Sequence, residues 1–390
     1  MFLRCLPGLV LVSSAALPGQ DIDPYTRFDP AAMQRLGYTS SGPFVLGSEH
    51  GPVSVDSELG IGTVRWLETP HFRIGSTLLA RPLPPTSKER RLLYAQCAAL
   101  HRLLPRIPEE PDQLDAWLQL HMFAHLLERV YSEFAALTGV DAGWLRANPP
   151  GRQVGQRGQG ALLGCSGKFV VLLFEERAQL SRYLRYFCAD REGEPWRQYL
   201  PDADAMLLAT SAGSWEGRLG DPRYVRAHVV YEIVQNFVDA FVGSSATAPL
   251  WWRRGLAEWF VRSVDDRVSG RMPPTLGPAW NPEDWHARLA ARLRHDVLPG
   301  LEEVLHWHRE DRRAEMDHAV MWSLTDLLLR RDERGVARWL RFVRQHPMGS
   351  RMMPRQLAIA WHKHALRGAF GLDLPGLREE WHRHVTLQAR

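Results

Sequence analysis

The chain lacks the features that define several classes of protein. Its 390 residues include four cysteines and no CxxC pair, which excludes a disulfide-rich scaffold and a cysteine-based zinc or redox motif. Lys and Arg number 48 against 44 Asp and Glu, so no charge excess points to nucleic acid. No run of about 18 apolar residues follows the N-terminal segment, and a membrane-spanning helix is not expected there. A Gly-rich phosphate loop and a GxSxG nucleophile elbow are also missing.

The composition that is present fits a folded globular protein. Hydrophobic residues make up 45% of the chain and charged residues 24%, which are ordinary values for a folded domain. A chain of this length can bury a large core without disulfide bonds. Its length is typical of two or three domains.

The first twenty residues have the features of a secretory signal peptide. One positive charge, Arg4, precedes an apolar or small stretch over 5–17, and Ser-Ala-Ala at 14–16 provides a small-x-small cleavage site. We therefore expect the mature protein to be secreted or periplasmic.

Export would permit a disulfide bond among the three remaining cysteines. Cys165 and Cys188 form the expected pair, because they flank one predicted strand-helix unit, and Cys97 would stay unpaired. Three cysteines equally allow all the thiols to remain free, and the sequence leaves both outcomes open.

The distribution of patterns along the chain predicts an α+β fold. Short β-like segments occur at 63–74, 168–174 and 205–210, whereas the chain from Pro222 onward is almost entirely helical. Helices are expected over 88–104, 112–137, 178–188, 223–242, 250–264, 283–295, 301–309, 316–331, 333–346, 354–366 and 374–386. The expected parts are a signal peptide at 1–20, an N-terminal arm with a short strand or two at 21–61, a domain at 62–265 and a helical subdomain at 266–390.

The segment 224–242, YVRAHVVYEIVQNFVDAFV, carries most of the functional information. Apolar residues cover most of the circumference of this predicted helix, so we expect it to be buried. One stripe is polar, because spacings of three and four residues place five side chains on one face. An unpaired buried carboxylate is expensive, so the stripe must line a cleft or join an internal network. The stripe consists of His228, Tyr231, Glu232, Gln235 and Asp239.

The next segment, PLWWRRGLAEWFV at 249–261, extends this pattern into a family resemblance. A helix with a central Glu, a short loop and then P-x-W-x-x-G-L-A-E-x-F resembles the gluzincin metallopeptidases, most closely the bacterial peptidase MA-like group. In that family the first helix carries HExxH and the second opens with W-x-x-E-G-x-A. The resemblance covers roughly 62–390, with the specific match confined to 224–262. It implies a zincin-like (thermolysin-like gluzincin) domain with a small strand-containing N-terminal part and a predominantly helical C-terminal part.

Carried over residue by residue, the family's zinc site is degenerate in this chain. The two histidine positions hold Tyr231 and Gln235, and the third ligand position, before Gly255, holds Arg254. Glu232 keeps the position of the general base. A phenol, an amide and a guanidinium cannot replace imidazole and carboxylate ligands, so zinc is expected to be lost and no cofactor is expected.

The resemblance therefore implies an exported, catalytically inactive gluzincin-like pseudopeptidase. We expect the cleft that corresponds to the family's active site to bind a peptide or a protein. The segment 205–210 is expected to be an edge strand that pairs with an extended peptide. No nucleic-acid partner is expected.

The substitutions suggest how the buried charges could balance without a metal. We hypothesise that Arg254 replaces zinc and lies between Glu232 and Glu258, the residue that matches the family's outer carboxylate. In the alternative, Arg254 points into solvent and Glu232 bonds Tyr231 or His228.

Other functions remain open. His228, Glu232 and Glu258 could form a rearranged metal site of an active metallopeptidase or other hydrolase, or Glu232 and His228 could act as a metal-free acid/base pair. A structural or assembly protein would fill the cleft with side chains instead. A second metal candidate, His121 and His125 with Glu128 one turn later, is more simply a pair of histidines on a framework helix. Surface or partly packed positions are expected for His306, His308, His318, His362, His364, His382 and His384.

Overall fold

The computed structural model describes most of the chain and divides it into two compact units. Unit 1 comprises Met1–Glu128, Lys168–Pro195 and Ala209–Ala212, and unit 2 comprises Arg129–Gly167, Trp196–Leu208 and Gly213–Arg390. The described residues are 21–47, 50–60, 62–151, 157–189, 193–243, 248–270, 282–307, 314–346 and 354–389. The expected signal peptide at 1–20 lies outside them. No helix in these ranges is long and apolar enough to cross a membrane.

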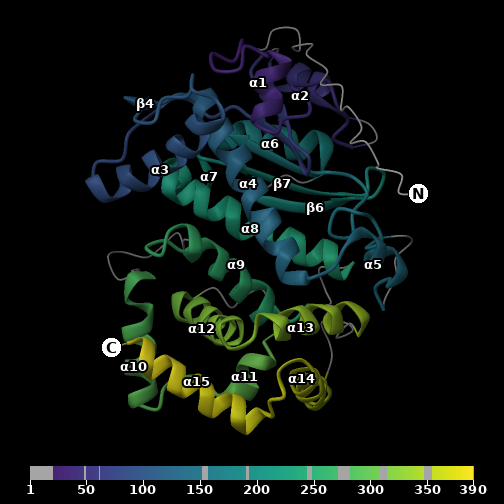
Figure 1. The fold of residues 1–390 in the computed structure, drawn as a ribbon, viewed down its shortest axis with the longest axis vertical. Helices are drawn as coiled ribbons and strands as arrows, with labels where there is room; N and C mark the ends of the chain where they lie inside the picture. The colour runs from purple at the N-terminus through teal and green to yellow at the C-terminus, as the bar shows by residue number, and fades with distance from the viewer. Residues whose placement is uncertain are drawn as a thin grey trace, which may run out of the picture. The chain divides into compact units, whose positions relative to one another are not determined.

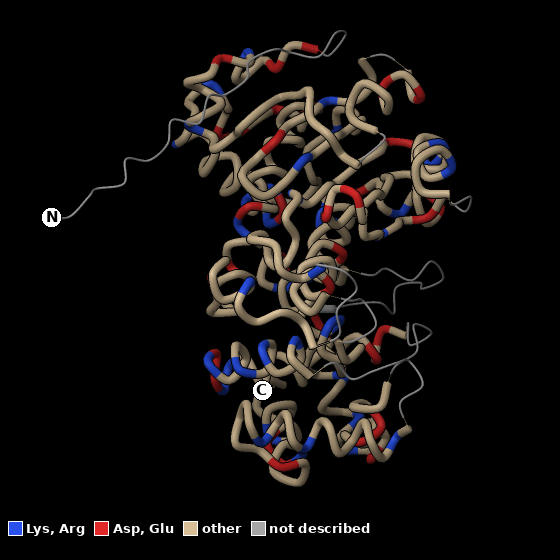
Figure 2. The backbone as a smooth tube through the Cα atoms, turned by 90° about the vertical axis from the view of Figure 1, so that its right-hand side faces the viewer, with Lys and Arg blue, Asp and Glu red and all other residues tan. Residues whose placement is uncertain are grey.

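The fold is α+β, as the sequence predicts, with the described strands before residue 212 and mostly helices after residue 213 (Figure 1). Figure 2 shows Lys and Arg interspersed with Asp and Glu along the backbone, in line with the nearly balanced composition.

Unit 1 begins with an arm that differs from the prediction. Two short helices, α1 (Pro30–Arg35) and α2 (Pro52–Leu59), form where a short strand or two was expected. Each helix has a proline in its first turn, where the missing backbone N–H costs nothing, and the Asp29 side chain caps α1 by accepting from the N–H of Ala32. The arm is packed rather than loose, because Asp23 and Tyr38 are almost completely buried.

The five-stranded sheet has the strand order β1-β2-β5-β7-β6. β1 pairs antiparallel with β2, and β2 pairs parallel with β5. β7 is an interior strand that belongs to both units, so the expected edge strand at 205–210 is wrong and β6 holds that edge. The strands are β1 (Arg65–Glu68), β2 (Phe72–Ser76), β5 (Phe169–Phe174), β6 (Trp196–Leu200) and β7 (Ala205–Ser211).

Most remaining elements of the first half of the chain are helices that the periodicity predicts. A small two-stranded sheet, β3 (Arg81–Pro82) with β4 (Gln113–Leu114), was not predicted. The helices are α3 (Ser87–Leu103), α4 (Ala116–Thr138), α5 (Ala142–Ala147) and α6 (Arg177–Phe187), of which only α5 was missed.

In unit 2, α8 (Pro222–Val242) is the helix that carries the polar stripe. Its start is fixed by Asp221, whose side chain accepts from the N–H of Arg223, and by Pro222 in the first turn. It ends at Gly243, which adopts the left-handed conformation with φ of 75°. Nearly all of its residues are buried, as predicted. A distorted turn precedes it, comprising α7 (Ser214–Gly217), in which Trp215 has φ of 51°, and η1 (Arg218–Gly220).

The other helices of unit 2 form its helical body, in which α9 lies beside α12 (Figure 1). Gly255 of α9 makes this close approach possible, because a Cβ there would lie 2.3 Å from the carbonyl oxygen of Met321. These elements are α9 (Leu250–Val264), η2 (Pro282–Asp284), α10 (Trp285–Arg294), α11 (Leu301–Leu305), α12 (Glu315–Arg331), α13 (Glu333–Gln345), α14 (Arg355–Phe370) and α15 (Leu374–Gln388).

One buried arginine of α13 holds several segments of unit 2 together. The Arg344 side chain is fully buried, and its acceptors within the described ranges are backbone carbonyls, at 2.8 Å for Asn148 and 3.1 Å for Leu145. It also donates to the carbonyls of Gly158 and of Phe241, the latter in the last turn of α8. One guanidinium thus binds four carbonyls that all lie more than 100 residues before Arg344 in the sequence.

Candidate functional site

The polar stripe of α8 meets an arginine that the sequence did not single out. Arg197 comes from β6, which is joined to β7 by the short turn at 201–204 and is therefore held in a hairpin. Its side chain is 19% exposed and reaches four side chains of the stripe and its flank. An edge strand thus supplies the cation for a buried helix face.

Every polar group of the Arg197 guanidinium finds an oxygen acceptor on α8. Nε lies 2.7 Å from a carboxylate oxygen of Glu232, and Nη1 lies 2.9 Å from Asp239. Nη1 also donates to Asn236 at 3.2 Å, and Nη2 donates to Gln235 at 3.4 Å. The Gln235 amide nitrogen donates to Glu232 at 3.1 Å, which links neighbouring members of the stripe. We call Arg197, Glu232, Gln235, Asn236 and Asp239 the Arg197 cluster.

The charges around this cluster balance. Asp239 has a second cation, Arg253 of α9, at 3.4 Å from its other oxygen. Two carboxylates, Glu232 and Asp239, therefore lie among two guanidinium groups, which satisfies the requirement that buried charges be paired. Asn236 donates to the carbonyl of Leu207 in β7 and adds a neutral link between the helix and the hairpin.

The three residues that the sequence analysis assigned to zinc-ligand positions are buried. Tyr231 and Arg254 have no exposed surface, and Gln235 is 3% exposed. Gly270 lies directly against Tyr231, because a Cβ at position 270 would fall 2.1 Å from the Tyr231 Cβ. Close packing therefore occupies the space in front of the first ligand position.

The hypothesis of an Arg254-centred network is wrong. The carboxylate of Glu232 binds Arg197 and Gln235, while the fully buried Glu258 accepts from Ser269 at 2.8 Å and from the N–H of Gly270 at 3.2 Å. Its third partner is His318 of α12, whose Nδ1 lies 2.9 Å from Glu258. Among the described residues neither acid contacts Arg254, so Arg254 does not lie between them in place of a metal. The alternative of a solvent-exposed Arg254 is also wrong, since the residue is fully buried.

The rearranged metal site is not assembled either. His228 Nδ1 lies 3.4 Å from the carbonyl oxygen of Gly270, and its ring meets the edge of Trp215 at a centroid distance of 4.7 Å. Glu232 and Glu258 are directed to Arg197 and His318 instead. Among the described residues, no group of three or more His, Cys, Asp and Glu side chains is arranged to hold a metal ion.

The second metal candidate separates into two structural networks of unit 1. His121 is fully buried, with Nε2 3.1 Å from Asp23 and Nδ1 2.7 Å from the hydroxyl of Tyr38. This pairing lowers the pKa of Asp23 despite its burial. Glu128 turns instead to the β1–β2 turn, where it accepts from His71. His121, one of the two histidines of this spacing, therefore fastens the N-terminal arm.

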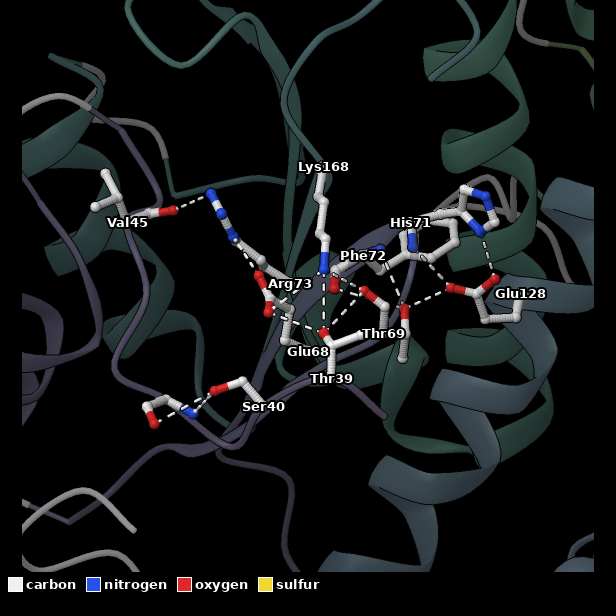
Figure 3. A network of polar contacts seen from close by, with 11 residues as sticks. Thr39, Ser40, Val45, Glu68, Thr69, His71, Phe72, Arg73, Glu128 and Lys168 are labelled. Atoms are coloured by element: carbon white, nitrogen blue, oxygen red, sulfur yellow. Dashed lines mark hydrogen bonds and ion pairs between the residues drawn. The ribbon is translucent and has the colours of Figure 1, made fainter. Parts of the chain in front are cut away.

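Figure 3 shows the network that Glu128 joins. Lys168, which precedes β5, donates to the carbonyl of Thr69 at 2.7 Å and lies 3.3 Å from Glu68, which also pairs with Arg73 at 2.9 Å. Burial lowers the pKa of Lys168, and Glu68 offsets part of that change. Burial alone would raise the pKa of Glu128, but its hydrogen bond from His71 leaves that pKa below the ordinary value. Each charge has a partner, so the network fixes the turn.

Several further expectations about single residues are wrong. His318 and His362 are fully buried rather than at the surface, and His384 is 9% exposed. His308 lies outside the described residues. Cys165 and Cys188 are not joined by a disulfide bond, which is one of the two outcomes that the sequence left open. Cys188 forms a hydrogen bond with Tyr183 instead, and burial raises the pKa of Cys165 to about 12.

The sequence contained a usable signal for Arg197 and none for His318. Trp196–Leu200 alternates in character and is followed by Pro-Asp-Ala-Asp and then an apolar run, which is the pattern of a hairpin with a polar turn. A prediction of this hairpin from the sequence would have placed Arg197 on a strand that pairs with the strand at 205–211. His318 pairs with a residue 60 positions away, and no local pattern indicates it.

We compared the chain with models of protein families, with curated proteins and with solved structures. None of the three comparisons found a match.

Proposed function

We propose that this protein is an exported, catalytically inactive relative of the gluzincin metallopeptidases that works without zinc. The observation that carries the proposal is the Arg197 cluster. A guanidinium binds the carboxylate at the general-base position, where a catalytic zinc site needs a carboxylate free to accept a proton from water. Tyr231, Gln235 and Arg254, at the ligand positions, offer no set of donors suited to zinc.

The burial of these residues favours a structural or assembly role over a peptide-binding cleft at α8. Glu232 is 14% exposed and its neighbours in the stripe are more deeply buried. A ligand at this face would have to displace Arg197 and break its contacts with two carboxylates. The partner of such a protein, a peptide or another protein, would bind elsewhere on its surface.

Metal analysis tests the loss of zinc. The chain without residues 1–20 is dialysed against zinc and then against metal-free buffer, and bound metal is measured by elemental analysis beside Glu232→Gln. We expect no stoichiometric zinc in either protein and no cleavage of a quenched peptide library. About one zinc per chain that disappears in Glu232→Gln would overturn the proposal.

A gain-of-metal variant tests the family assignment separately. Tyr231→His, Gln235→His and Arg254→Glu restore the ligand set, and Arg197→Ala removes the competing cation. If the backbone of these helices is arranged as in a gluzincin, the fourfold variant should bind about one zinc per chain. A variant that keeps its helical circular dichroism and still binds no zinc would count against the assignment. The triple variant that keeps Arg197 is the matched control and should bind zinc more weakly.

A further inference from the structure

Unit 2 contains a cavity that has no part in the α8 site. Its volume is about 610 Å³, and its walls come from α4, α9 and α13. This volume lies within the roughly 300–1,000 Å³ typical of sites for small molecules. No residue of α8 or β6 lines it, so an inference about this cavity does not depend on the proposed function.

Part of the cavity lining is apolar. Leu137 of α4 and Phe260 and Trp259 of α9 form this wall. The indole N–H of Trp259 donates to Asp326 at 3.2 Å, which fixes the orientation of the ring. Ala136 and Ala337 are small and leave the space open. The wall is suited to an aliphatic or aromatic group, which would gain free energy by leaving water.

Three arginines of α13 also line the cavity. Arg334, Arg338 and Arg341 are four and three residues apart and therefore share one face of the helix. Arg338 donates to the carbonyl of Ala369 at 2.9 Å, and Arg341 donates to the carbonyl of Gly139, so both guanidinium groups are held in place. Arg334 is exposed, and within the described residues its side chain forms no hydrogen bond or ion pair.

The acidic residues nearby leave an excess of positive charge. Glu133 lies 3.7 Å from Arg129 one turn before it, and Asp332 lies 2.7 Å from Arg338. Once these pairs are set aside, Arg334 and Arg341 face the single carboxylate of Glu333. An anion is therefore favoured in this cavity over a cation.

We propose that this cavity binds a small organic anion with an apolar body, such as a medium-chain carboxylate. The apolar body lies against Trp259, Phe260 and Leu137, and the carboxylate is placed at the arginines. A guanidinium matches a carboxylate with two parallel N–H groups, which gives both attraction and orientation. Because Arg338 and Arg341 are already held by carbonyls, little side-chain entropy is lost on binding.

Three ligands of equal chain length test the charge and the body of the ligand separately. Octanoate, octylammonium and octanol are titrated into the full chain by isothermal calorimetry at low salt. We expect saturable 1:1 binding of octanoate with a Kd on the order of 1 mM, and at least roughly tenfold weaker binding of the other two. Octylammonium that binds as tightly as octanoate, or octanoate that shows no saturation, would overturn the proposal.

Two variants tie the binding to this cavity. Arg334→Glu reverses a charge that has no partner in the described part of the chain, and it should weaken octanoate binding about tenfold. Ala337→Trp fills the cavity and should abolish binding while the melting temperature stays near that of the wild type. Arg367→Glu, an exposed position on α14 that does not line the cavity, is the matched control and should leave the Kd unchanged. Octanoate affinity that is unchanged in both cavity variants would place the binding elsewhere and refute the inference.

Discussion

Two arginines of unit 2 fasten α8 through acceptors of different kinds. Arg197 binds side chains on the helix face, among them the carboxylates of Glu232 and Asp239, and is 19% exposed. Arg344 is fully buried, and the acceptors that the described part of the chain offers it are backbone carbonyls, including that of Phe241 at the end of the helix. The first arginine has counter-ions, whereas the second has hydrogen-bond acceptors alone.

The comparison shows that a buried guanidinium needs acceptors more than it needs an opposite charge. Burial lowers the pKa of Arg344 to about 10, which still leaves the group charged at neutral pH. Its guanidinium donates four hydrogen bonds to carbonyls. The carbonyl at the C-terminal end of a helix carries part of the negative end of the helix dipole. Arg197 instead neutralises two acids that would be costly to bury alone.

The largest expected effect comes from removing the arginine that has no counter-ion. Arg344→Ala leaves four carbonyls without their donor and opens a cavity beside Trp144 and Phe241. We expect a loss of about 3–5 kcal/mol in the free energy of unfolding, measured by urea denaturation. Arg334→Ala on the same helix is the control and should change stability by less than about 0.5 kcal/mol. A smaller loss for Arg344→Ala than for Arg197→Ala would reverse the comparison.

A third buried base sharpens the comparison, because histidine can give up its charge and arginine cannot. The Nε2 of His362 accepts from the indole N–H of Trp251 at 3.0 Å, and its Nδ1 donates to the carbonyl of Ala358 at 2.7 Å. Burial lowers the pKa of His362 to about 4, below the unfolded value of 6.5. Its stabilising contribution is therefore complete above pH 6.5 and is lost as the pH falls toward 4.

This loss should amount to about 3 kcal/mol between pH 7 and pH 4, since one pKa unit corresponds to about 1.4 kcal/mol. Urea denaturation at several pH values measures it. His362→Gln cannot take up a proton, so its stability should fall less steeply over the same range. Parallel pH profiles for the two proteins would show that His362 is not held neutral.

Removing the paired arginine should cost less than removing Arg344. Arg197→Ala leaves Asp239 with Arg253, and water can reach the partly exposed Glu232. We expect a loss of about 2 kcal/mol in the free energy of unfolding. The loss should shrink in about 0.5 M salt, because screening weakens partly exposed charge pairs, while the loss for Arg344→Ala should not. If salt changed the stability loss of Arg197→Ala and of Arg344→Ala equally, the charge of the acceptors would not explain the difference between the two arginines.

The smallest effect is expected at the carboxylate itself. Glu232→Gln keeps an oxygen that can accept from Arg197 Nε and keeps the shape of the side chain, but removes one negative charge. The free energy of unfolding should fall by about 1 kcal/mol or less, as the melting temperature reports. Asp239→Asn is the matched comparison and should cost more, since Asp239 is 1% exposed and lies between two guanidinium groups. The reverse order would mean that Glu232, and not Asp239, is the main partner of Arg197.

The sequence predicted the elements of the site better than its contacts. The helix expected at 223–242 is observed as Pro222–Val242, and the helix expected at 250–264 has those bounds. Their caps and apolar periodicity are local signals, so a single sequence carries them. The polar stripe was predicted to need partners, and it has them in the Arg197 cluster.

The identity of those partners could not be predicted, because they lie far away in the sequence. Arg197 precedes Glu232 by 35 residues, and His318 follows Glu258 by 60 residues. Arg254 was chosen because the resemblance places it at the third ligand position, whereas the cation that binds Glu232 is Arg197, which the resemblance does not mark. The N-terminal arm was misjudged for a similar reason, since the partner that buries Asp23 is His121.

The position of Arg197 on β6 also bears on how the protein avoids aggregation. β6 lies at an edge of the sheet, where unpaired backbone N–H and C=O groups could recruit a strand from another molecule. An inward-pointing charge on such a strand discourages this pairing, because a strand added outside it would bury the charge more deeply and disturb its contacts. The side chain that neutralises the acids of α8 thereby also keeps this edge from acting as a template for self-association.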